Sequence, residues 1–296
     1  MDKYDKEINF HCAGIFFHID LWILFLSLLD QYPEAKKENA KIGSLFDAPA
    51  STLWNGGRLL CGSRYNEEDL KFIKDFVNNH NIPIRFTFTN CLLEEKHLKD
   101  EYCNLLLNIF STGENEITIN SDLLKNYIEI EYPNKFKFIS SVTKCLTKEE
   151  TYDELKKDFH LVVLNYYFNH DFNFLQTIKE KNKIEILVNS KCGLNCKRRF
   201  AHYKVFSKCQ LENNPQTSFY CPYKITNPDT RAHYITSKEI NDIYIPLGFS
   251  NFKIEGRGDN PQMLLFELCE YLIKESYKDF IYDTVMLNLD KIKYEE

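Results

Sequence analysis

Short apolar runs alternate with longer amphipathic segments along most of the chain. Apolar and β-branched runs predict strands at residues 41–45, 59–61, 83–89, 116–119, 136–140, 161–164, 184–188 and 251–255. Apolar residues at helical spacing predict helices at residues 66–79, 100–111, 122–132, 148–157, 172–181 and 261–277. The chain therefore reads as a succession of strand–helix units.

Strands that alternate with helices of this length are typical of parallel βαβ units. We predict an α/β fold, a (β/α) TIM-type barrel that is regular or irregular, in one domain over residues 1–296. Residues 1–38 are expected to form an N-terminal helical segment, and residues 189–240 a cysteine-rich insertion after a late strand. An open doubly wound sheet is the alternative, although no G-x-G-x-x-G follows the first strand.

The bulk composition narrows the class of protein. The 296 residues are 44% apolar and carry a formal net charge of -6, which argues against a general DNA-binding protein. The apolar stretch at residues 13–29 contains His18 and Asp20 and is short for a membrane span, so we expect a buried helix and no membrane association. The first seven residues lack a basic signal region, which predicts the reducing cytoplasm. There, ten cysteines favour metal ligation over disulfides.

Four cysteines follow the strand predicted at residues 184–188. They are Cys192, Cys196, Cys209 and Cys221. Four thiolates at a strand end suit an iron–sulfur cluster or a tetrahedral zinc ion, although the paired C-x2-C of zinc ribbons is absent. The alternative is that some are ordinary buried thiols. We expect that role for the cysteines on apolar segments, which are Cys12, Cys91, Cys103, Cys145 and Cys269, while Cys61 is a spare ligand.

A basic run surrounds Cys196. It contains Lys197, Arg198, Arg199, His202 and Lys204. Cations beside thiolates favour the deprotonated form, and they also bind anionic substrates. The alternatives are a solvated charge run and, for His202, a role as a replacement metal ligand.

Polar residues follow many of the predicted strands. In a barrel the loops after the strands form the active face, so Arg58, Asn90, Asp122, Glu255 and Arg257 are candidate site residues. Arg58 and Arg257 each follow glycine, which lets the backbone approach a ligand while the guanidinium forks onto a carboxylate or phosphate. The chain has no G-x-S-x-G, H-E-x-x-H or Walker loop, so common hydrolase and NTPase chemistries lack support.

Several segments together resemble the collagenase-like peptidase family U-32. The similarity lies at residues 79–90, 116–124 and 137–143, and above all in residues 185–196 and Phe252-Lys253-Ile254-Glu255-Gly256-Arg257. The family typically has a cysteine-bearing loop after one strand, followed by a Lys-Ile-Glu-Gly-Arg segment. This chain departs from it with Asn189-Ser190 where His-Gly is common, and with Gly258-Asp259 where Met-Lys is common.

The resemblance implies a barrel in which Cys192, Cys196, Cys209 and Cys221 hold a [4Fe–4S] cluster. It also implies an enzyme, or an enzyme subunit with a homologous partner, in oxygen-independent hydroxylation or related redox chemistry on a small molecule or RNA. Lys253, Glu255 and Arg257 are then the catalytic candidates, and Arg58, Asn90, Asp122 and Arg199 the substrate-binding ones. The alternatives are a non-catalytic scaffold with a structural four-cysteine zinc site, and a metal-independent peptidase.

Overall fold

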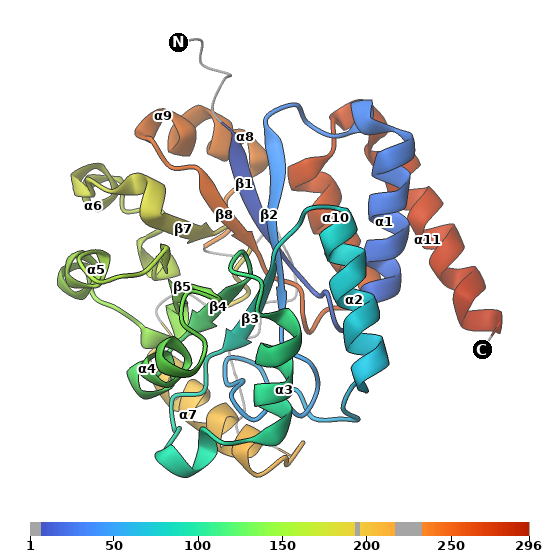
Figure 1. The fold of residues 1–296 in the computed structure, drawn as a ribbon. Helices are drawn as coiled ribbons and strands as arrows, with labels where there is room; N and C mark the ends of the chain where they lie inside the picture. The colour runs from blue at the N-terminus through green and yellow to red at the C-terminus, as the bar shows by residue number, and fades with distance from the viewer. Residues whose placement is uncertain (1–6, 193–195, 217–232, 296) are drawn as a thin grey trace.

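The strands close into a barrel, as the strand–helix alternation predicts. The structure, a computed structural model, describes residues 7–192, 196–216 and 233–295. Within these residues, parallel strands β1 to β8 pair in chain order and β8 pairs with β1 (Figure 1). They are β1 (Ile8–Ala13), β2 (Ala40–Asp47), β3 (Ile84–Phe88), β4 (Glu116–Ile119), β5 (Lys137–Ser140), β6 (Leu161–Val163), β7 (Ile184–Leu187) and β8 (Asn251–Ile254). The predicted TIM-type barrel is confirmed.

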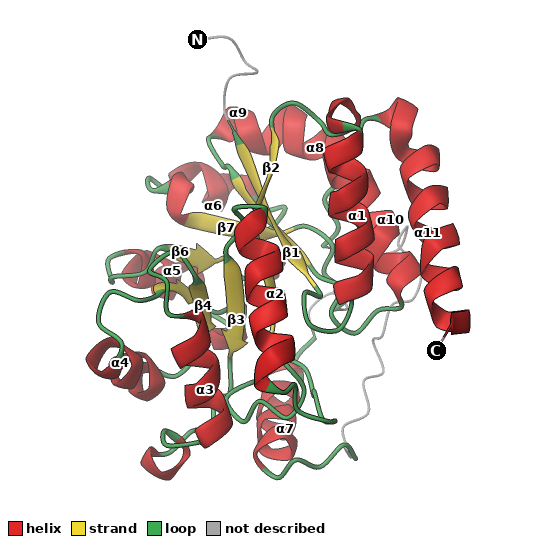
Figure 2. Cartoon of the chain, turned by 45° about the vertical axis from the view of Figure 1, so that its right-hand side comes forward, coloured by secondary structure: helices red, strands yellow, loops and turns green. Residues whose placement is uncertain are grey.

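Helices surround the strands and are the main layer between the barrel and solvent (Figure 2). They are α1 (Ile19–Gln31), α2 (Glu67–Asn79), α3 (Glu101–Phe110), α4 (Asp122–Glu131), α5 (Lys148–Leu155), α6 (Phe172–Thr177), α7 (Arg199–Leu211), α8 (Ser237–Glu239), α9 (Ile245–Leu247), α10 (Pro261–Leu272) and α11 (Lys278–Glu295). Several begin at a polar residue whose side chain accepts a hydrogen bond from the helix backbone, which satisfies an otherwise unpaired N–H. Asn66, Asp100, Ser121, Thr147 and Asn260 do this. Among the described helices, none is long and apolar enough to cross a membrane.

Two predicted elements need correction. Residues 1–38 were expected to be helical, but β1 precedes α1 and pairs with β2 and β8. In β1 the apolar residues alternate with polar ones that face the barrel interior, and the longer apolar run of α1 obscures this short pattern. Residues 59–61 form no strand, because the backbone of Leu60 bonds to the Gln210 side chain and to Ser51.

The barrel interior holds a fully buried charge network (Arg85, Glu116, Glu185, His11 and Lys253). Arg85 Nε donates to Glu116 Oε2 at 2.7 Å, and Nη1 donates to Glu185 Oε2. Lys253 Nζ lies 3.4 Å from Glu185 Oε1. Burial raises the pKa of Glu185, but the Arg85 and Lys253 cations outweigh it and hold that pKa below its usual value. Burial lowers the pKa of His11 to about 4, so its ring is neutral at pH 7.

The helix α7 crosses the end of the barrel toward which the strands run (Figure 1). It lies within the predicted insertion between β7 and β8, where no helix was expected. Its buried face carries Arg199, Ser207 and Gln210 alongside Tyr203 and Cys209, so its apolar periodicity is weak. A helix held by buried polar groups leaves little hydrophobic pattern in the sequence.

Candidate functional site

Hydrogen bonds fasten α7 to the loop after β2. Gln210 Nε2 donates to the carbonyls of Thr52 and Leu60, both at 3.0 Å, and Gln210 Oε1 accepts from Leu60 N at 2.9 Å. Gly56 makes the close approach possible, because a Cβ there would lie 2.5 Å from Asn90 Cα and 2.7 Å from Ser207 Oγ. The mouth of the barrel is therefore covered by a closely fitted helix.

Asn90, a predicted substrate-binding residue, lies at this junction. Its Nδ2 reaches the carbonyls of Leu53, Asn55 and Ser207 at 3.1–3.2 Å, and its Oδ1 accepts from Leu92 N at 2.9 Å. The side chain is fully buried and joins three segments of backbone. This placement favours a structural role for Asn90.

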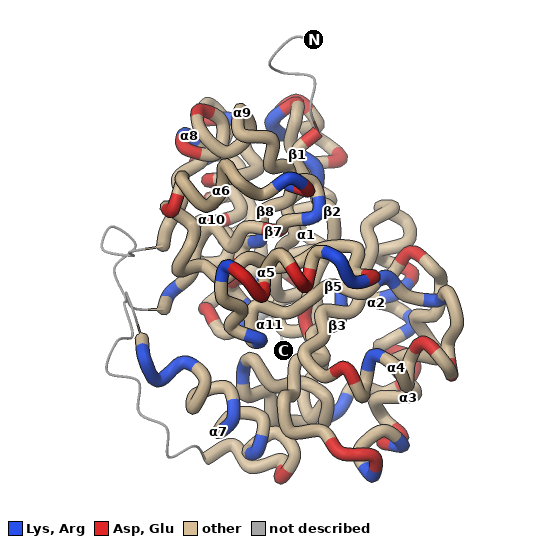
Figure 3. The backbone as a smooth tube through the Cα atoms, turned by 90° about the vertical axis from the view of Figure 1, so that its left-hand side faces the viewer, with Lys and Arg blue, Asp and Glu red and all other residues tan. Residues whose placement is uncertain are grey.

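Arg199, another predicted substrate-binding residue, is buried under the first turn of α7. Its guanidinium donates to Asn165 Oδ1 at 2.6 Å and to the Val142 carbonyl at 2.7 Å. It lies 4.0 Å from the centre of the Tyr166 ring, a cation–π contact. Arg199 thus ties α7 to the loops after β5 and β6. Lys197 and Arg198, just before α7, are exposed, and so are Lys204 and Lys208 within it. Figure 3 shows the Lys and Arg positions of α7 as blue segments of the backbone tube.

The two Gly-Arg elements, far apart in sequence, meet at the mouth. Arg257 Nη1 donates to Thr87 Oγ1 at 2.5 Å and to Asn55 Oδ1 at 3.3 Å. A Cβ on Gly57 would lie 3.7 Å from Arg257 Nη2, an ordinary contact distance, so the Gly57 backbone lies beside this guanidinium. Arg58 Nη2 lies 3.4 Å from Glu255 Oε2, and the Arg58 side chain is 36% exposed. Arg257, Arg58 and Glu255, all predicted, are therefore brought together.

Asp47, at the end of β2, completes this cluster. It is fully buried, and its Oδ1 accepts from Ala48 N at 2.8 Å and lies 3.9 Å from Arg257 Nη1. Burial raises its pKa to about 7, although Arg257 and the backbone amides of Ala48, Phe16 and Phe17 act in the opposite direction. Burial also lowers the pKa of Arg257. The sequence places Asp47 among the polar residues that follow predicted strands, but it was not singled out as a catalytic or substrate-binding residue.

Lys253 and Glu255 lie on the same strand end at different depths. Lys253 is inside the barrel, its Nζ 3.9 Å from the centre of the Phe46 ring, and burial lowers its pKa to about 8. The backbone of Glu255 is held by Asn189, whose Oδ1 accepts from Glu255 N at 2.7 Å and whose Nδ2 donates to Glu255 O at 2.9 Å. Asn189 therefore aligns the ends of β7 and β8.

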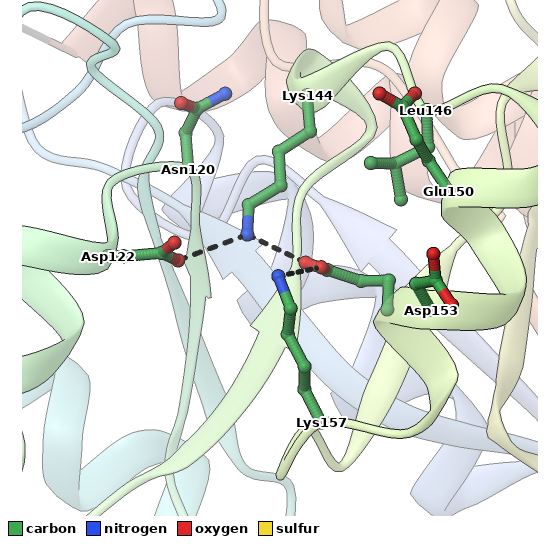
Figure 4. Close-up of a pocket in the computed structure, with 8 residues that line it drawn as sticks. Asn120, Asp122, Lys144, Leu146, Glu150, Asp153 and Lys157 are labelled. Atoms are coloured by element: carbon green, nitrogen blue, oxygen red, sulfur yellow. Dashed lines mark hydrogen bonds and ion pairs between the residues drawn. The ribbon is translucent and has the colours of Figure 1, made fainter.

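Asp122 lies apart from this cluster. Together with Lys144 and Glu154 it lines a surface pocket of about 290 Å³ beside α4 and α5 (Figure 4). Lys144 Nζ lies 2.6 Å from Glu154 Oε1 and 3.4 Å from Asp122 Oδ1. The structure does not bring Asp122 together with Arg257 and Arg58.

The predicted cysteine ligands are divided. Cys192 and Cys196 precede α7, and burial together with the Cys196 sulfur raises the pKa of Cys192. Cys209 lies near the opposite end of α7, about 15 Å along the helix axis from its first residue. There, burial and the neighbouring charge of Cys209 both raise the pKa of Cys61. Cys221 lies outside the described residues. Among residues 7–192, 196–216 and 233–295, no three His, Cys, Asp or Glu side chains are arranged to hold a metal ion.

Two cysteines that the sequence placed in the core lie near the mouth instead. Cys91 Sγ is 3.4 Å from Ser207 Oγ of α7, and Cys145 is half-buried at the left-handed turn after β5. Cys12, Cys103 and Cys269 are buried, as predicted. The apolar residues beside Cys91 and Cys145 belong to strand ends and turns, which sequence periodicity does not separate from core positions.

Comparison with known proteins identifies the fold. No family model matches the chain, and no curated protein matches it. A solved structure, that of the U32 peptidase Mk0906, is similar over 88% of this chain and 96% of that one, with 14% sequence identity and a TM-score of 0.54. The likeness supports the predicted resemblance at the level of the barrel fold.

Proposed function

We propose that this chain is an enzyme that binds an anionic substrate at the C-terminal end of its barrel and transfers a proton through Asp47. The meeting of Arg257 with Asp47, from β8 and β2, carries the proposal. TIM-type barrels have their active sites at this end, built from residues at the ends of different strands. The arrangement also joins the Gly-Arg elements of the two halves of the chain.

Arg58 and Arg257 are the anion-binding groups of the proposal. Both guanidiniums lie at the mouth, and Arg58 adds to burial in lowering the pKa of Arg257. An anion between them relieves this repulsion and accepts hydrogen bonds from both forks. A carboxylate or a phosphate meets these requirements, and a peptide ending in a carboxylate also fits the name of the structural neighbour.

Asp47 is the proton-transfer group of the proposal. A pKa of about 7 keeps both protonation forms populated at neutral pH, as a general acid–base requires. Arg257 Nη1 lies 3.9 Å from Asp47 Oδ1, and its positive charge holds the Asp47 pKa down, so an anion that offsets this charge favours the protonated form of Asp47.

The described thiols do not fit one iron–sulfur or zinc centre. Cys192 and Cys196 supply two neighbouring sulfurs, but Cys209 lies at the other end of α7. No step of the proposed reaction therefore passes through a metal. Redox hydroxylation is implied by the family resemblance alone, and it is not part of the proposed reaction.

We expect Arg58→Ala and Arg257→Ala each to weaken anion binding about tenfold to hundredfold, because each removes hydrogen bonds to a charged group. Titration with inorganic phosphate and, separately, with succinate, followed by protein NMR shifts, measures this and distinguishes the two anion types. Arg64→Ala is the matched control, an exposed arginine of the same loop. Equal binding by all three variants and the parent would contradict the proposal.

We expect Asp47→Asn to change the pH dependence of stability. Ionising a buried carboxyl costs stability, so the parent loses stability as pH rises from about 4, the unfolded pKa, toward about 7. The asparagine variant lacks this loss, so its stability relative to the parent is greater at pH 8 than at pH 5. Thermal denaturation at both values tests the prediction, and parallel curves for the two proteins would refute it.

We expect anaerobically purified protein to contain iron and zinc well below one atom per chain, because Cys209 does not face Cys192 and Cys196. Elemental analysis and absorbance spectra measure this. Stoichiometric metal that is lost in Cys209→Ser would show that the cysteines converge, against the described placement.

A further inference from the structure

Hydrogen bonds on both sides of Cys61 hold the loop after β2 against the end of α7. On one side, Leu60 exchanges two hydrogen bonds with Gln210, at 2.9 and 3.0 Å. On the other side, Ser51 Oγ lies 2.6 Å from the Gly62 carbonyl and 3.1 Å from Asn213 Oδ1. These contacts fix the loop after β2 against the last turn of α7.

Cys61 and Cys209 are each next to a residue that forms the hydrogen bonds of this junction. Cys61 lies between the two anchored residues Leu60 and Gly62, and Cys209 directly precedes Gln210. Cys61 is half-buried, so small reagents reach it, whereas Cys209 is buried. The Cys209 sulfur acts electrostatically on Cys61, which is consistent with neighbouring thiols.

We propose that Cys61 and Cys209 form a reversible disulfide when the protein meets a peroxide. The Cys61 thiolate attacks hydrogen peroxide, and its sulfur becomes a sulfenic acid as hydroxide leaves. The Cys209 thiolate then attacks that sulfur, which forms the S–S bond and releases the oxygen as hydroxide. The two hydroxides take up the two thiol protons, so two thiols and one peroxide give one disulfide and two waters.

The disulfide would link α7, which covers the mouth of the barrel, to the loop that carries part of the proposed anion-binding site. The loop that carries Cys61 also carries Gly57 and Arg58, while Cys209 belongs to α7. The bond closes a long stretch of chain, which reduces the entropy of the unfolded state and raises thermal stability. Oxidation therefore fixes α7 over the mouth of the barrel.

Peptide mapping tests the proposal on the full chain. The protein is treated with hydrogen peroxide at pH 7 and pH 9, free thiols are blocked, and the digest is analysed by mass spectrometry without reduction. We expect a Cys61–Cys209 linked peptide that dithiothreitol removes and that forms faster at pH 9, because burial raises the pKa of Cys61. We also expect oxidation to raise the melting temperature.

Serine variants supply the controls. Cys61→Ser and Cys209→Ser each lose the linked peptide and the rise in melting temperature, while Cys269→Ser, a buried thiol of α10, retains both. A link from Cys209 to another cysteine, or oxidation of Cys61 to sulfinic acid without a link, would overturn the proposal.

Discussion

Arg85→Met is expected to destabilise the protein by about 3–5 kcal/mol, because it leaves Glu116 and Glu185 buried without their main cation. Methionine fills much of the same space, so the loss reports the missing charge more than a cavity. Urea denaturation at pH 7 measures the difference.

The pH dependence of stability distinguishes the loss of the Arg85 charge from general misfolding of the variant. The pKa of Glu185 is held below its unfolded value, so its stabilising contribution is present at pH 7 and is lost as pH falls through the unfolded pKa and below. The gap between parent and variant should therefore shrink as the pH falls below about 4.5, the unfolded pKa of the carboxyl. Arg64→Met, at an exposed arginine, should cost less than about 1 kcal/mol. A gap that is small or constant with pH would count against the charge network.

Gly56→Ala is expected to loosen α7 from the mouth and to cost about 1–3 kcal/mol, because the new Cβ meets backbone. It would lie 2.5 Å from Asn90 Cα and 2.8 Å from Asn90 N, backbone atoms of the loop just after β3 that cannot rotate away. Limited trypsin digestion measures the release of α7, since the exposed Lys204 and Lys208 become cleavable as the helix separates.

Gly258→Ala is the matched control, because a Cβ there meets nothing within 4 Å. It should leave both the unfolding free energy and the trypsin pattern unchanged. Equal digestion of the two alanine variants would show that α7 does not depend on the close approach at Gly56.

Much of the architecture was predictable from the chain alone. Apolar runs such as Ile184–Leu187 sit between polar turns, and this spacing predicted seven of the barrel strands and the late position of the insertion. The buried charges also left a signal, since Arg85, Glu116 and Glu185 each stand beside apolar residues in a strand. In a strand, such neighbours point to opposite faces, which indicates a polar barrel interior.

The sequence by itself determined the fold class and the residues that end at the mouth of the barrel, including Arg58, Glu255 and Arg257. Only the tertiary structure decided which of these side chains meet, how α7 covers them, and that Cys209 lies near the far end of α7 from Cys196. Strand periodicity is a local property of neighbouring residues. Side-chain partnership depends on the closure of the barrel, which joins β8 to β1 and brings together residues about two hundred positions apart.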